Sequence, residues 1–309
     1  MTSPANPRRL PFTKGHGTQN DFVLLDDRAG ELDLTADLVR ALTDRRAGIG
    51  GDGVIRVAAT ASVPEGAQIL AADPGATWFM DYRNCDGSVA EMCGNGVRVF
   101  AALLERLGLG PTGSVLAVGT RAGVRYVRRE PNGWYAVDMG PWCLTGGPDA
   151  AAAGTDALVA VAGLDVPRPA LRVEVGNPHV VLALADTDEL AGADLTRAPE
   201  VRPAPPHGTN VELVVPLGEQ TTDGAAVGRL RMRVYERGVG ETRSCGTGAC
   251  AAALAVRTWA GAGAPDSWLV EVPGGTLRVR VLASGHVELA GPAALVASGE
   301  IDLDALQPS

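Results

Sequence analysis

Short runs in which hydrophobic and polar residues alternate recur along the chain, and this period of two predicts β-strands. In the first half, the runs cover residues 20–26, 53–58 and 78–84, with shorter ones near 114–118, 123–129 and 133–138. In the second half, they cover residues 171–176, 179–186, 210–216 and 230–237, and residues 268–289 suggest two or three hairpin strands. The pattern therefore predicts a fold rich in β-structure in both halves.

Three other segments show apolar residues at helical spacing. Residues 35–46 begin with a threonine that suits an N-cap, residues 95–108 end at a glycine, and residues 247–260 are rich in alanine. Residues 60–76 and 140–154 are rich in Ala, Pro and Gly, so we expect a loop in the former and a domain boundary in the latter. Few helices among many strands indicate an α+β class.

The two halves repeat similar features in the same order, at a spacing of roughly 150 residues. The segment CGNGVRVFAALL at 93–104 resembles CGTGACAAALAV at 245–256, and Gly17-x-x-Asn20 before one strand resembles GNPH at 176–179 before another. This repetition predicts two copies of one unit. If a pseudo-two-fold axis relates the copies, equivalent residues face each other across a cleft.

Composition narrows the classes of partner. The chain has 309 residues, enough for two domains, and a net charge of −9. An acidic surface argues against binding to nucleic acid or to an anionic membrane. No secretory signal and no run of about 18 apolar residues is present, so we expect a cytoplasmic protein with no membrane partner. Its five cysteines are then expected to be free thiols.

Two of these cysteines, Cys93 and Cys245, each precede a Gly-x-Gly turn and an apolar helix. Unpaired backbone N–H groups and the helix dipole favour anions at such a position, which can lower the pKa of a thiol. The glycines let the backbone approach a ligand closely. One such cysteine is more often a small buried residue. Two such cysteines, one in each of the repeated halves, predict a pair of thiols that act as acid and base. The glycine turns beside them would bind a carboxylate.

Opposed thiols suit inversion at the α-carbon of an amino acid. One thiolate removes the α-proton, the opposite thiol protonates the other face, and the helix N-termini stabilise the charge that develops on the carboxylate. The usual alternative uses pyridoxal phosphate, which needs a Schiff-base lysine. Lys14, the only lysine, lies at the start of the chain, so no cofactor is expected.

Other chemical motifs are weaker. Cys250 lies on the apolar face of a predicted helix and suits core packing, whereas Cys85 and Cys143 belong to no motif. The cysteine spacing does not match a zinc site, so no metal is expected. The sequence GIGGDG at 48–53 matches G-x-G-x-x-G, but it follows a helix and precedes a strand, the reverse of a dinucleotide-binding fingerprint.

Seven segments of the chain together resemble the diaminopimelate epimerase family. They are KGHGTQNDFV (14–23), GIGGDGV (48–54), YRNCDGSVAEMCGNGVRVFA (82–101), GNPHVV (176–181), GTNVEL (208–213), YERGVGET (235–242) and SCGTGACAAA (244–253). They span nearly the whole chain in the family's order. Related proline-racemase and phenazine-type branches share the fold but lack the full set.

The resemblance implies two pseudo-symmetric α/β domains, each a mixed β-sheet wrapped around a central α-helix. Residues 1–138 would form the N-terminal half, to which the tail at about 292–309 returns, and residues 139–291 the C-terminal half. It also implies an isomerase that interconverts L,L- and meso-diaminopimelate without a cofactor, for lysine and peptidoglycan synthesis. The small-molecule substrate is the expected partner, and the resemblance is compatible with a homodimer.

The resemblance also assigns residues to roles. Cys93 and Cys245 would be the acid–base pair. His179 and Glu236 would support the chemistry, and Glu236 would also contact substrate. The other substrate-binding residues would be Asn20, Asn84, Gly94, Asn95, Asn177, Asn210, Arg237, Gly246 and Thr247. An arginine suits a distal carboxylate, whereas asparagine and glutamate suit ammonium groups. For a single asparagine an Asx turn is the commoner interpretation, and an isolated Glu–Arg pair is usually solvated.

Two features depart from the family pattern. Gly53 stands where many members have a glutamine that touches substrate, which puts that contact in doubt. The stretch GHVELAG at 285–291 lacks the aromatic residue that family dimers can use. A racemase of another amino acid and a dehydratase of the same fold are the nearest alternative functions. A thiol redox or binding protein, with Cys93 and Cys245 as a disulfide switch, is an alternative of a different class.

Overall fold

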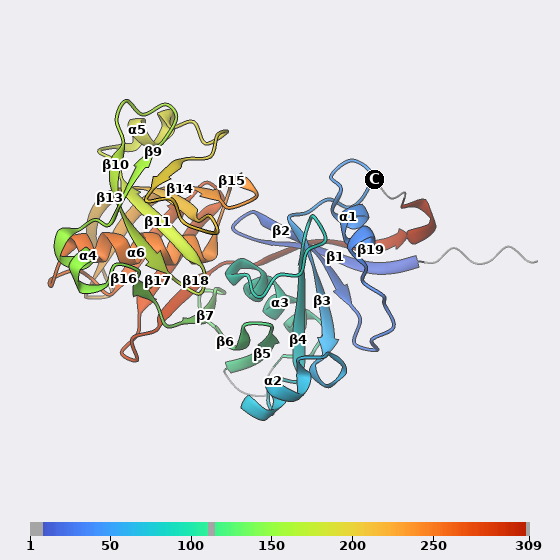
Figure 1. Cartoon of the computed structure of the whole chain (residues 1–309). Helices are drawn as coiled ribbons and strands as arrows, with labels where there is room; N and C mark the ends of the chain where they lie inside the picture. Colours follow the sequence, from blue (N-terminus) through green and yellow to red (C-terminus); the bar gives the residue numbers. More distant parts are fainter. Residues whose placement is uncertain (1–8, 111–114, 307–309) are drawn as a thin grey trace, which may run out of the picture. The chain divides into compact units, whose positions relative to one another are not determined.

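The computed structural model describes residues 9–110 and 115–306, which form two compact units (Figure 1). The first unit comprises the chain up to Tyr135 together with the residues from Pro292 onward, and the second unit comprises Ala136–Gly291. The chain enters the second unit within β7 (Tyr135–Gly140), because β7 pairs with β18 (Val287–Gly291) of that unit.

In the described part of the first unit, seven strands form a mixed sheet in the spatial order β19–β1–β2–β3–β4–β5–β6. The strands are β1 (Arg9–Gly17), β2 (Asn20–Asp26), β3 (Gly53–Ala59), β4 (Trp78–Asn84), β5 (Val115–Thr120), β6 (Gly123–Arg129) and β19 (Ala294–Asp302). The chain therefore returns from the second unit to add β19 beside β1, antiparallel to it.

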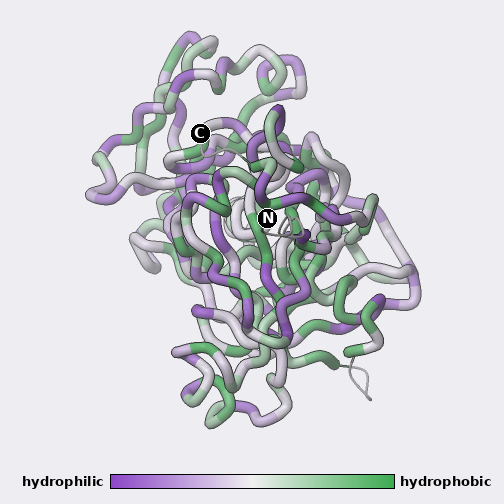
Figure 2. The backbone as a smooth tube through the Cα atoms, turned by 90° about the vertical axis from the view of Figure 1, so that its right-hand side faces the viewer, coloured by the Kyte–Doolittle hydropathy of each residue, from purple (hydrophilic) through white to green (hydrophobic). Residues whose placement is uncertain are grey.

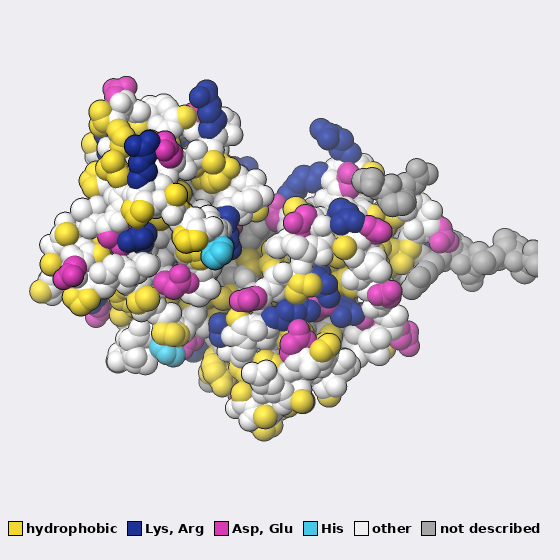
Figure 3. Space-filling model, viewed as in Figure 1, with side chains coloured by type: hydrophobic (Ala, Val, Ile, Leu, Met, Phe, Trp, Pro, Cys, Tyr) yellow, Lys and Arg dark blue, Asp and Glu magenta, His cyan; other side chains and the backbone are white. Residues whose placement is uncertain are grey.

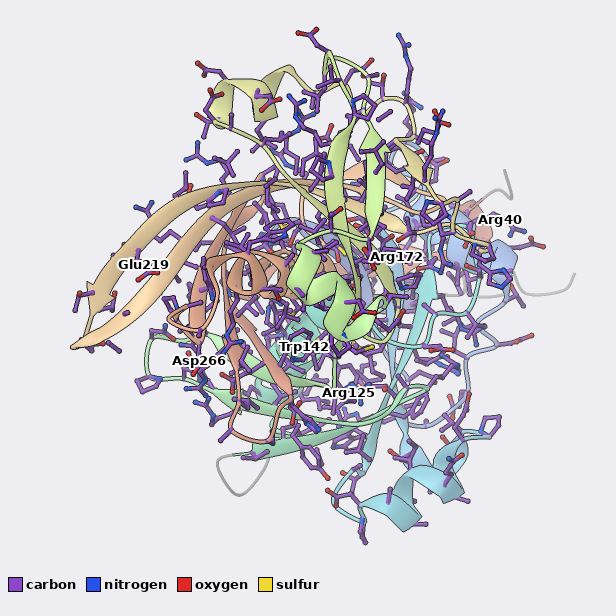
Figure 4. The ribbon with its side chains drawn as sticks, turned by 60° about the vertical axis from the view of Figure 1, so that its left-hand side comes forward. Arg40, Arg125, Trp142, Arg172, Glu219 and Asp266 are labelled. Carbon is purple, nitrogen blue, oxygen red and sulfur yellow. The ribbon has the colours of Figure 1, made fainter. Side chains whose placement is uncertain are left out.

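The second unit contains a sheet in the spatial order β12–β9–β10–β11–β13–β14–β16–β17–β18–β7. The strands not yet defined are β9 (Ala157–Ala160), β10 (Arg168–Glu174), β11 (Pro178–Ala183), β12 (Glu200–Arg202), β13 (Asn210–Thr222), β14 (Ala225–Glu236), β16 (Ser267–Val272) and β17 (Gly275–Val281). Two short strands, β8 (Cys143–Leu144) and β15 (Gly240–Thr242), pair with β10 and β14. The outer half of the β13–β14 hairpin is exposed and includes Glu219 (Figure 4).

Strand directions repeat between the units. From β1 to β6 the successive pairs are antiparallel, parallel, antiparallel, parallel and antiparallel. The series β10–β11–β13–β14–β16–β17 has the same five relations in the same order. Each series is interrupted after its fourth strand by the long helix of its unit, α3 (Gly94–Arg106) or α6 (Gly246–Ala260). The duplication expected from the cysteine motifs is thus present in the topology.

Both long helices are buried against their sheets, as the sequence predicts for a helix that is apolar on most sides. Eleven consecutive residues of α3, from Gly94 to Leu104, are buried. In α6 the buried stretch reaches Val256, interrupted only at Thr247. The sheet of each unit therefore curves around one central helix (Figure 1). The expected α/β fold class is confirmed.

Shorter helices flank the sheets. They are α1 (Ala36–Thr43), α2 (Gly66–Ala72), α4 (Gly147–Ala153) and α5 (Thr187–Gly192), with two 3-10 turns at Thr60–Ser62 and Leu303–Ala305. Helices α1, α2 and α5 pack on the face opposite the long helix of their unit. Leu42 of α1 packs with Val23 and Val54, and Leu190 of α5 packs with Val180 and Leu213. Central strands such as β2 and β11 thus contribute apolar residues to two layers. Hydrophobic and hydrophilic segments alternate along the chain in Figure 2.

Several local expectations need correction. Residues 60–76 were expected to be a loop but contain α2, whose Ile69 packs against Phe79. Residues 140–154 contain β8 and α4. Composition is a weak guide in these segments, because burial of one or two apolar side chains suffices to order a short helix. The segments of β1 and β19 were not predicted as strands. These strands have few fully buried residues and show no clear alternation of hydrophobic and polar positions.

A buried ionic cluster lies within the first unit around Asp81 of β4, which is fully buried. Its carboxylate accepts hydrogen bonds from Arg56 (Nη2 at 2.7 Å), Arg83 (Nε at 2.9 Å) and Arg121 (Nη2 at 2.7 Å). Burial alone raises the pKa of Asp81, but the hydrogen bonds from Arg83 and Arg121 outweigh it, so the pKa lies below its usual value. Asp81 therefore compensates three arginines at once.

Asp81→Asn should lower the free energy of unfolding by about 1.5–3 kcal/mol, because three partly buried arginines lose their shared counter-charge. Arg56 and Arg121 keep a second carboxylate partner each, Asp27 and Glu65, which limits the loss. Urea denaturation at pH 7 measures this change. The matched control is Asp26→Asn, which removes an ion pair with Arg28 at the surface and should cost less than about 1 kcal/mol.

The lowered pKa of Asp81 also predicts a pH dependence. Ionised Asp81 stabilises the folded state above the unfolded pKa of about 4, and this contribution is lost as the pH falls through the lower folded pKa. Stability of the parent protein should therefore decline more steeply than that of Asp81→Asn below about pH 4. Equal losses in the two proteins would show that Asp81 is not the stabilising carboxylate.

Candidate active site

Cys93 is the N-cap residue of α3 in the first unit. Its Sγ accepts a hydrogen bond from the backbone N–H of Gly96 at 3.4 Å, so the sulfur takes the place of the usual Ser or Asp cap. The thiol also donates to Oδ1 of Asn20 at 3.5 Å. Cys93 is partly exposed, whereas Gly94 and Asn95 are buried. The sulfur therefore stands at the open end of a buried helix.

Asn20, the first residue of β2, connects this helix to the sheet. Its Oδ1 also accepts from Asn95 Nδ2 at 3.2 Å, and its own Nδ2 donates to Asp52 at 2.7 Å. Behind Asn95, the fully buried Arg98 donates to Oδ1 of Asn95 at 2.8 Å. The sequence-predicted residues Asn20, Cys93, Gly94 and Asn95 thus form one cluster, and both asparagine amides have fixed orientations.

A network of charged residues supports this cluster and was not anticipated. Asp21 forms ion pairs with Lys14 at 2.5 Å and with Arg45 at 2.8 Å, and Arg45 also reaches Asp52. Burial raises the pKa of Asp21, but Arg45 and Lys14 together lower it to about 2. Burial raises the pKa of Asp52 above its usual value. Lys14, the single lysine, is therefore held in an ion pair.

Gly53 and Asn84 lie opposite each other on β3 and β4. A Cβ at Gly53 would come within 2.4 Å of the Arg83 carbonyl oxygen and 2.7 Å of the Tyr82 ring. A side chain of any size is thus excluded at position 53 by backbone and by Tyr82. The side chain of Asn84 donates to Ser88 Oγ at 3.0 Å, within the turn that leads to Cys93.

Cys245 occupies the equivalent position in the second unit, as the N-cap residue of α6. Its Sγ accepts from the backbone N–H of Gly248 at 3.4 Å and lies 3.6 Å from Thr247 Oγ1. Cys245 is buried, as is Gly246. The two sulfurs therefore cap their helices in the same way, but Cys93 is partly exposed and Cys245 is buried.

Burial raises the pKa of the Cys245 thiol well above its usual range, and the nearby carboxylates of Glu236 and Glu212 raise it further. The hydrogen bonds from Thr247 and Gly248 lower it but do not compensate. The expectation that the helix N-terminus lowers the thiol pKa is wrong for Cys245. Desolvation outweighs the N-cap interaction where the sulfur is shielded from water.

Glu236 ends β14 beside Cys245. Thr242 Oγ1 donates a hydrogen bond to its Oε1. Burial raises the pKa of Glu236, Glu212 raises it further, and hydrogen bonds from Thr242 and Cys245 lower it. The carboxyl group is thus placed to accept from the thiol.

His179 lies behind this thiol with its ring fully enclosed. Its Nδ1 is 2.7 Å from Glu212 Oε1, and its Nε2 is 3.0 Å from Asn177 Oδ1. Glu212 was not anticipated. The signal available was a single carboxylate within the apolar strand NVELVVP, where an ionisable residue on a buried face needs a partner.

Asn210 and Arg237 belong to the same unit. Asn210 begins β13, and its Oδ1 accepts from the backbone N–H of Arg237 at 2.9 Å. The Arg237 guanidinium donates to the His207 carbonyl oxygen at 2.9 Å. Thr247 and Glu236 thus neighbour Cys245, whereas Asn177, Asn210 and Arg237 contact His179, the Arg237 backbone and His207. All predicted residues of the second half belong to this unit.

The other three cysteines differ in exposure. Cys250 is fully buried in α6, as expected, and Cys85 and Cys143 are exposed. None of the five cysteines, all of which lie within the described residues, forms a disulfide. Basic and acidic side chains are interspersed on the face shown in Figure 3. In the described part of the chain, none of the helices has the length and apolarity needed to cross a membrane.

A family model described as diaminopimelate epimerase matches residues 12–144 and 171–296. The chain is 48% identical to the diaminopimelate epimerase of Streptomyces coelicolor, over 95% of this chain and 96% of that protein. It is 48% identical to that of Thermobifida fusca, over 96% and 100%. It is 44% identical to that of Corynebacterium glutamicum, over 95% and 99%.

Solved structures share the fold at low sequence identity. A predicted epimerase from Pseudomonas aeruginosa superposes with a TM-score of 0.62 at 15% identity, over 94% of this chain and 99% of that one. A hydroxyproline epimerase from Agrobacterium vitis superposes with a TM-score of 0.58 at 17% identity, over 97% and 93%.

The raised pKa predicts the reactivity of Cys245. Its alkylation by iodoacetamide should be slower than that of exposed Cys143 at pH 7.5, and should rise about tenfold per pH unit between pH 8 and pH 9. Mass spectrometry of the digested protein measures both sites in one sample. Glu236→Gln removes one carboxylate that raises the pKa and should move the Cys245 profile to lower pH. A rate that levels off below pH 8 would contradict the raised pKa.

Proposed function

The chain belongs to the diaminopimelate epimerase family, and from this premise we propose that it interconverts L,L- and meso-diaminopimelate by a two-thiol, cofactor-independent mechanism. Family membership makes it an isomerase, with a place in lysine biosynthesis. Cys93 and Cys245 are the proposed acid and base.

One observation carries the mechanism: each unit places a cysteine as the N-cap of its central helix, with a glycine N–H hydrogen-bonded to the sulfur at 3.4 Å. If Cys93 and Cys245 had unrelated roles, there would be no reason for both to cap the central helix of their unit in the same way. A helix N-terminus beside each sulfur offers backbone N–H groups and a positive dipole to a carboxylate. These are the groups needed where negative charge develops as an α-proton leaves.

The proposed steps balance without an added reagent. The thiolate of one cysteine takes the α-proton, so the C–H bond breaks, an S–H bond forms and the electron pair is delocalised into the α-carboxylate. The thiol of the other cysteine then donates its proton to the opposite face of the carbon. After the forward reaction, the first sulfur carries the proton and the second is the thiolate. The reverse reaction returns each sulfur to its starting state. The mechanism requires both sulfurs to reach one α-carbon in the substrate complex.

The raised pKa of Cys245 suits this chemistry. A thiol of high pKa remains protonated at neutral pH, which makes Cys245 the ready acid, and its thiolate is a strong base when formed. Glu236 lies close enough to the Cys245 thiol to raise its pKa, and so can guide its proton. Cys93, which is partly exposed and bonded to Asn20, is the ready partner in the first unit.

The second amino-acid end of the substrate needs its own recognition. Asn84, Asn177, Asn210, Glu236 and Arg237 supply the amide, carboxyl and guanidinium groups that an ammonium and a carboxylate require. With Lys14 held by Asp21, the chain's single lysine is engaged in structure. A cytoplasmic location and a homodimeric assembly stay predictions.

Incubation of the reduced protein with L,L-diaminopimelate in deuterated water tests the proposal. Without added cofactor, the meso isomer should form with deuterium at the inverted carbon. Cys93→Ala and Cys245→Ala should each lower epimerisation by at least about 100-fold, because one face loses its proton donor or acceptor. Chiral chromatography and mass spectrometry follow isomer and isotope separately.

The single variants also separate the two faces. Each should retain slow exchange of the α-proton only in the isomer whose hydrogen faces the remaining thiol, and the two variants should favour opposite isomers. Cys143→Ala, an exposed cysteine away from both clusters, is the control and should keep full activity. Full epimerisation by either active-site variant would exclude the two-thiol mechanism. A parallel assay with other amino acids tests the alternative racemase.

A further inference from the structure

Asn20 stands at the end of a strained turn beside Cys93. The turn joins β1 to β2, and Gly17 pairs with Asn20 across it. Its two central residues, Thr18 and Gln19, have φ angles of 49° and 64°. Such left-handed angles are costly in residues other than glycine, most of all in a β-branched residue such as threonine. A turn of this kind persists only where the surrounding side chains hold it.

Arg98 of α3 is a side chain that holds this turn. It is fully buried, and its Nη2 donates to Thr18 Oγ1 at 3.3 Å and to Asn95 Oδ1 at 2.8 Å. A Cβ at Gly17 would stand 3.0 Å from the same nitrogen, so the turn lies against the guanidinium group. Because a guanidinium group can only donate, the Asn95 oxygen must face Arg98, and its Nδ2 must face the other way.

The orientation of the Asn20 amide follows from both of its neighbours. On one side, Asn95 Nδ2 donates to Asn20 Oδ1 at 3.2 Å. On the other side, Asn20 Nδ2 donates to Asp52 Oδ2 at 2.7 Å, and this oxygen also accepts from the backbone N–H of Asp21 at 3.0 Å. A backbone N–H can only donate, so Asp52 Oδ2 is an acceptor here. The two sides agree, and they leave Asn20 Oδ1 as the atom 3.5 Å from Cys93 Sγ.

The second unit forms the same sheet and helix without these groups. Asp52 directly precedes β3, and its counterpart Thr209 directly precedes β13. The helix positions of the first unit that orient Asn20 also carry other residues in the second unit, where Asn95 and Arg98 are replaced by Thr247 and Cys250. The fold therefore does not require an acid, an asparagine and an arginine at these places. They need an explanation in the chemistry of the first half-site.

The oxygen held at Cys93 favours one form of the sulfur. A carbonyl oxygen accepts a hydrogen bond from a thiol and offers none to a thiolate. In this orientation, a Cys93 thiolate receives the backbone N–H of Gly96 but no hydrogen bond from Asn20. When the sulfur takes a proton, the new S–H group can turn to the Asn20 oxygen. A hydrogen bond made only by the protonated form favours proton transfer to the sulfur.

We propose that Asp52 is a positioning residue for Cys93: it holds the NH2 group of Asn20, keeps the Asn20 oxygen at the sulfur and so preserves the strength of the Cys93 thiolate as a base. Arg98 fixes the other side of the same chain of hydrogen bonds through Asn95. This inference rests on the proposed function, because it treats Cys93 as an acid–base group. It gives Asn20 a role toward the thiol, in addition to any contact with substrate.

The charged groups around Asp52 allow its side chain to be changed. Arg45 donates to its other oxygen, Oδ1, at 2.8 Å, and the side chains of Arg45 and Asp52 are 59% and 39% exposed. Arg45 also pairs with Asp21, which in turn pairs with Lys14. The Cys85 thiol is near as well: burial raises its pKa, and the negative charge of Asp52 contributes to this rise. Cys85 therefore reports the charge at position 52.

Two substitutions separate orientation from charge. Asp52→Asn removes the charge but keeps an oxygen where the backbone N–H of Asp21 requires one, so Asn20 stays in place. Asp52→Leu removes the acceptor and lets the Asn20 NH2 group turn to the sulfur. Half-maximal alkylation of Cys93 by iodoacetamide should then occur about half a pH unit or more lower in Asp52→Leu than in Asp52→Asn. Cys85, measured in the same digests by mass spectrometry, should shift equally in both variants.

Proton exchange supplies a second readout. In a Cys245→Ala background, exchange of the substrate α-proton depends on Cys93, and in a Cys93→Ala background it depends on Cys245. Adding Asp52→Leu should slow exchange about tenfold in the first background and less than about threefold in the second. Asp52→Asn should restore most of the Cys93-dependent rate. Asp26→Leu removes a carboxylate from the other end of β2 and, as the control, should leave both rates unchanged.

The outcomes are distinct. Equal Cys93 profiles in the two Asp52 variants, or equal slowing of exchange in both backgrounds, would overturn the role of Asp52. If Asp52→Leu does not fold, Asp52→Ala makes the same comparison, because the backbone hydrogen bonds of residue 52 with Asp21 and Cys85 remain. If the parent protein does not epimerise diaminopimelate, the proposed function fails, whereas the alkylation profiles still decide whether Asp52 orients Asn20.

Discussion

Each unit of this protein depends on one constraint, the need to satisfy the N-terminal N–H groups of a helix that is otherwise enclosed by its own sheet. In both units a cysteine sulfur meets part of this need, through the glycine three residues on. The cap leaves the sulfur at the boundary between the apolar core and the open end of the helix. The same interaction that ends the helix thus presents a reactive group beside a positive dipole.

The glycines follow from this constraint. The helix can approach the sheet at its first turn only if position 96 or 248 lacks a side chain, because Ile55 or Glu212 fills the space. Close approach brings the sulfur within reach of side chains on the strand ends. Asn20 reaches Cys93 in one unit, and Glu236 reaches Cys245 in the other. The strand ends are therefore where the two copies differ chemically.

The copies also differ in how they manage charge. The first unit surrounds Asn20 with Asp21, Asp52, Arg45 and Lys14, so its carboxylates have cationic partners near the surface. The second unit places a fully buried carboxylate, Glu212, and a partly buried one, Glu236, beside a buried thiol. Desolvation then raises the pKa of the Cys245 thiol despite the helix N-terminus. A duplicated fold thus provides two thiols with the same cap and different electrostatic surroundings.

The sequence by itself determined much of this arrangement. Periodicity placed most central strands and both long helices, because their apolar faces have a simple repeat, and the paired motifs located both capping cysteines. Segments with few buried residues, such as β1, α2 and β19, were missed because their order comes from pairing partners distant in sequence. Only the tertiary structure decided that Glu212 would meet His179, that Tyr82 would exclude a side chain at Gly53, and that Cys245 would be desolvated. Each of these results depends on distances between residues on different elements, and chain spacing does not set those distances.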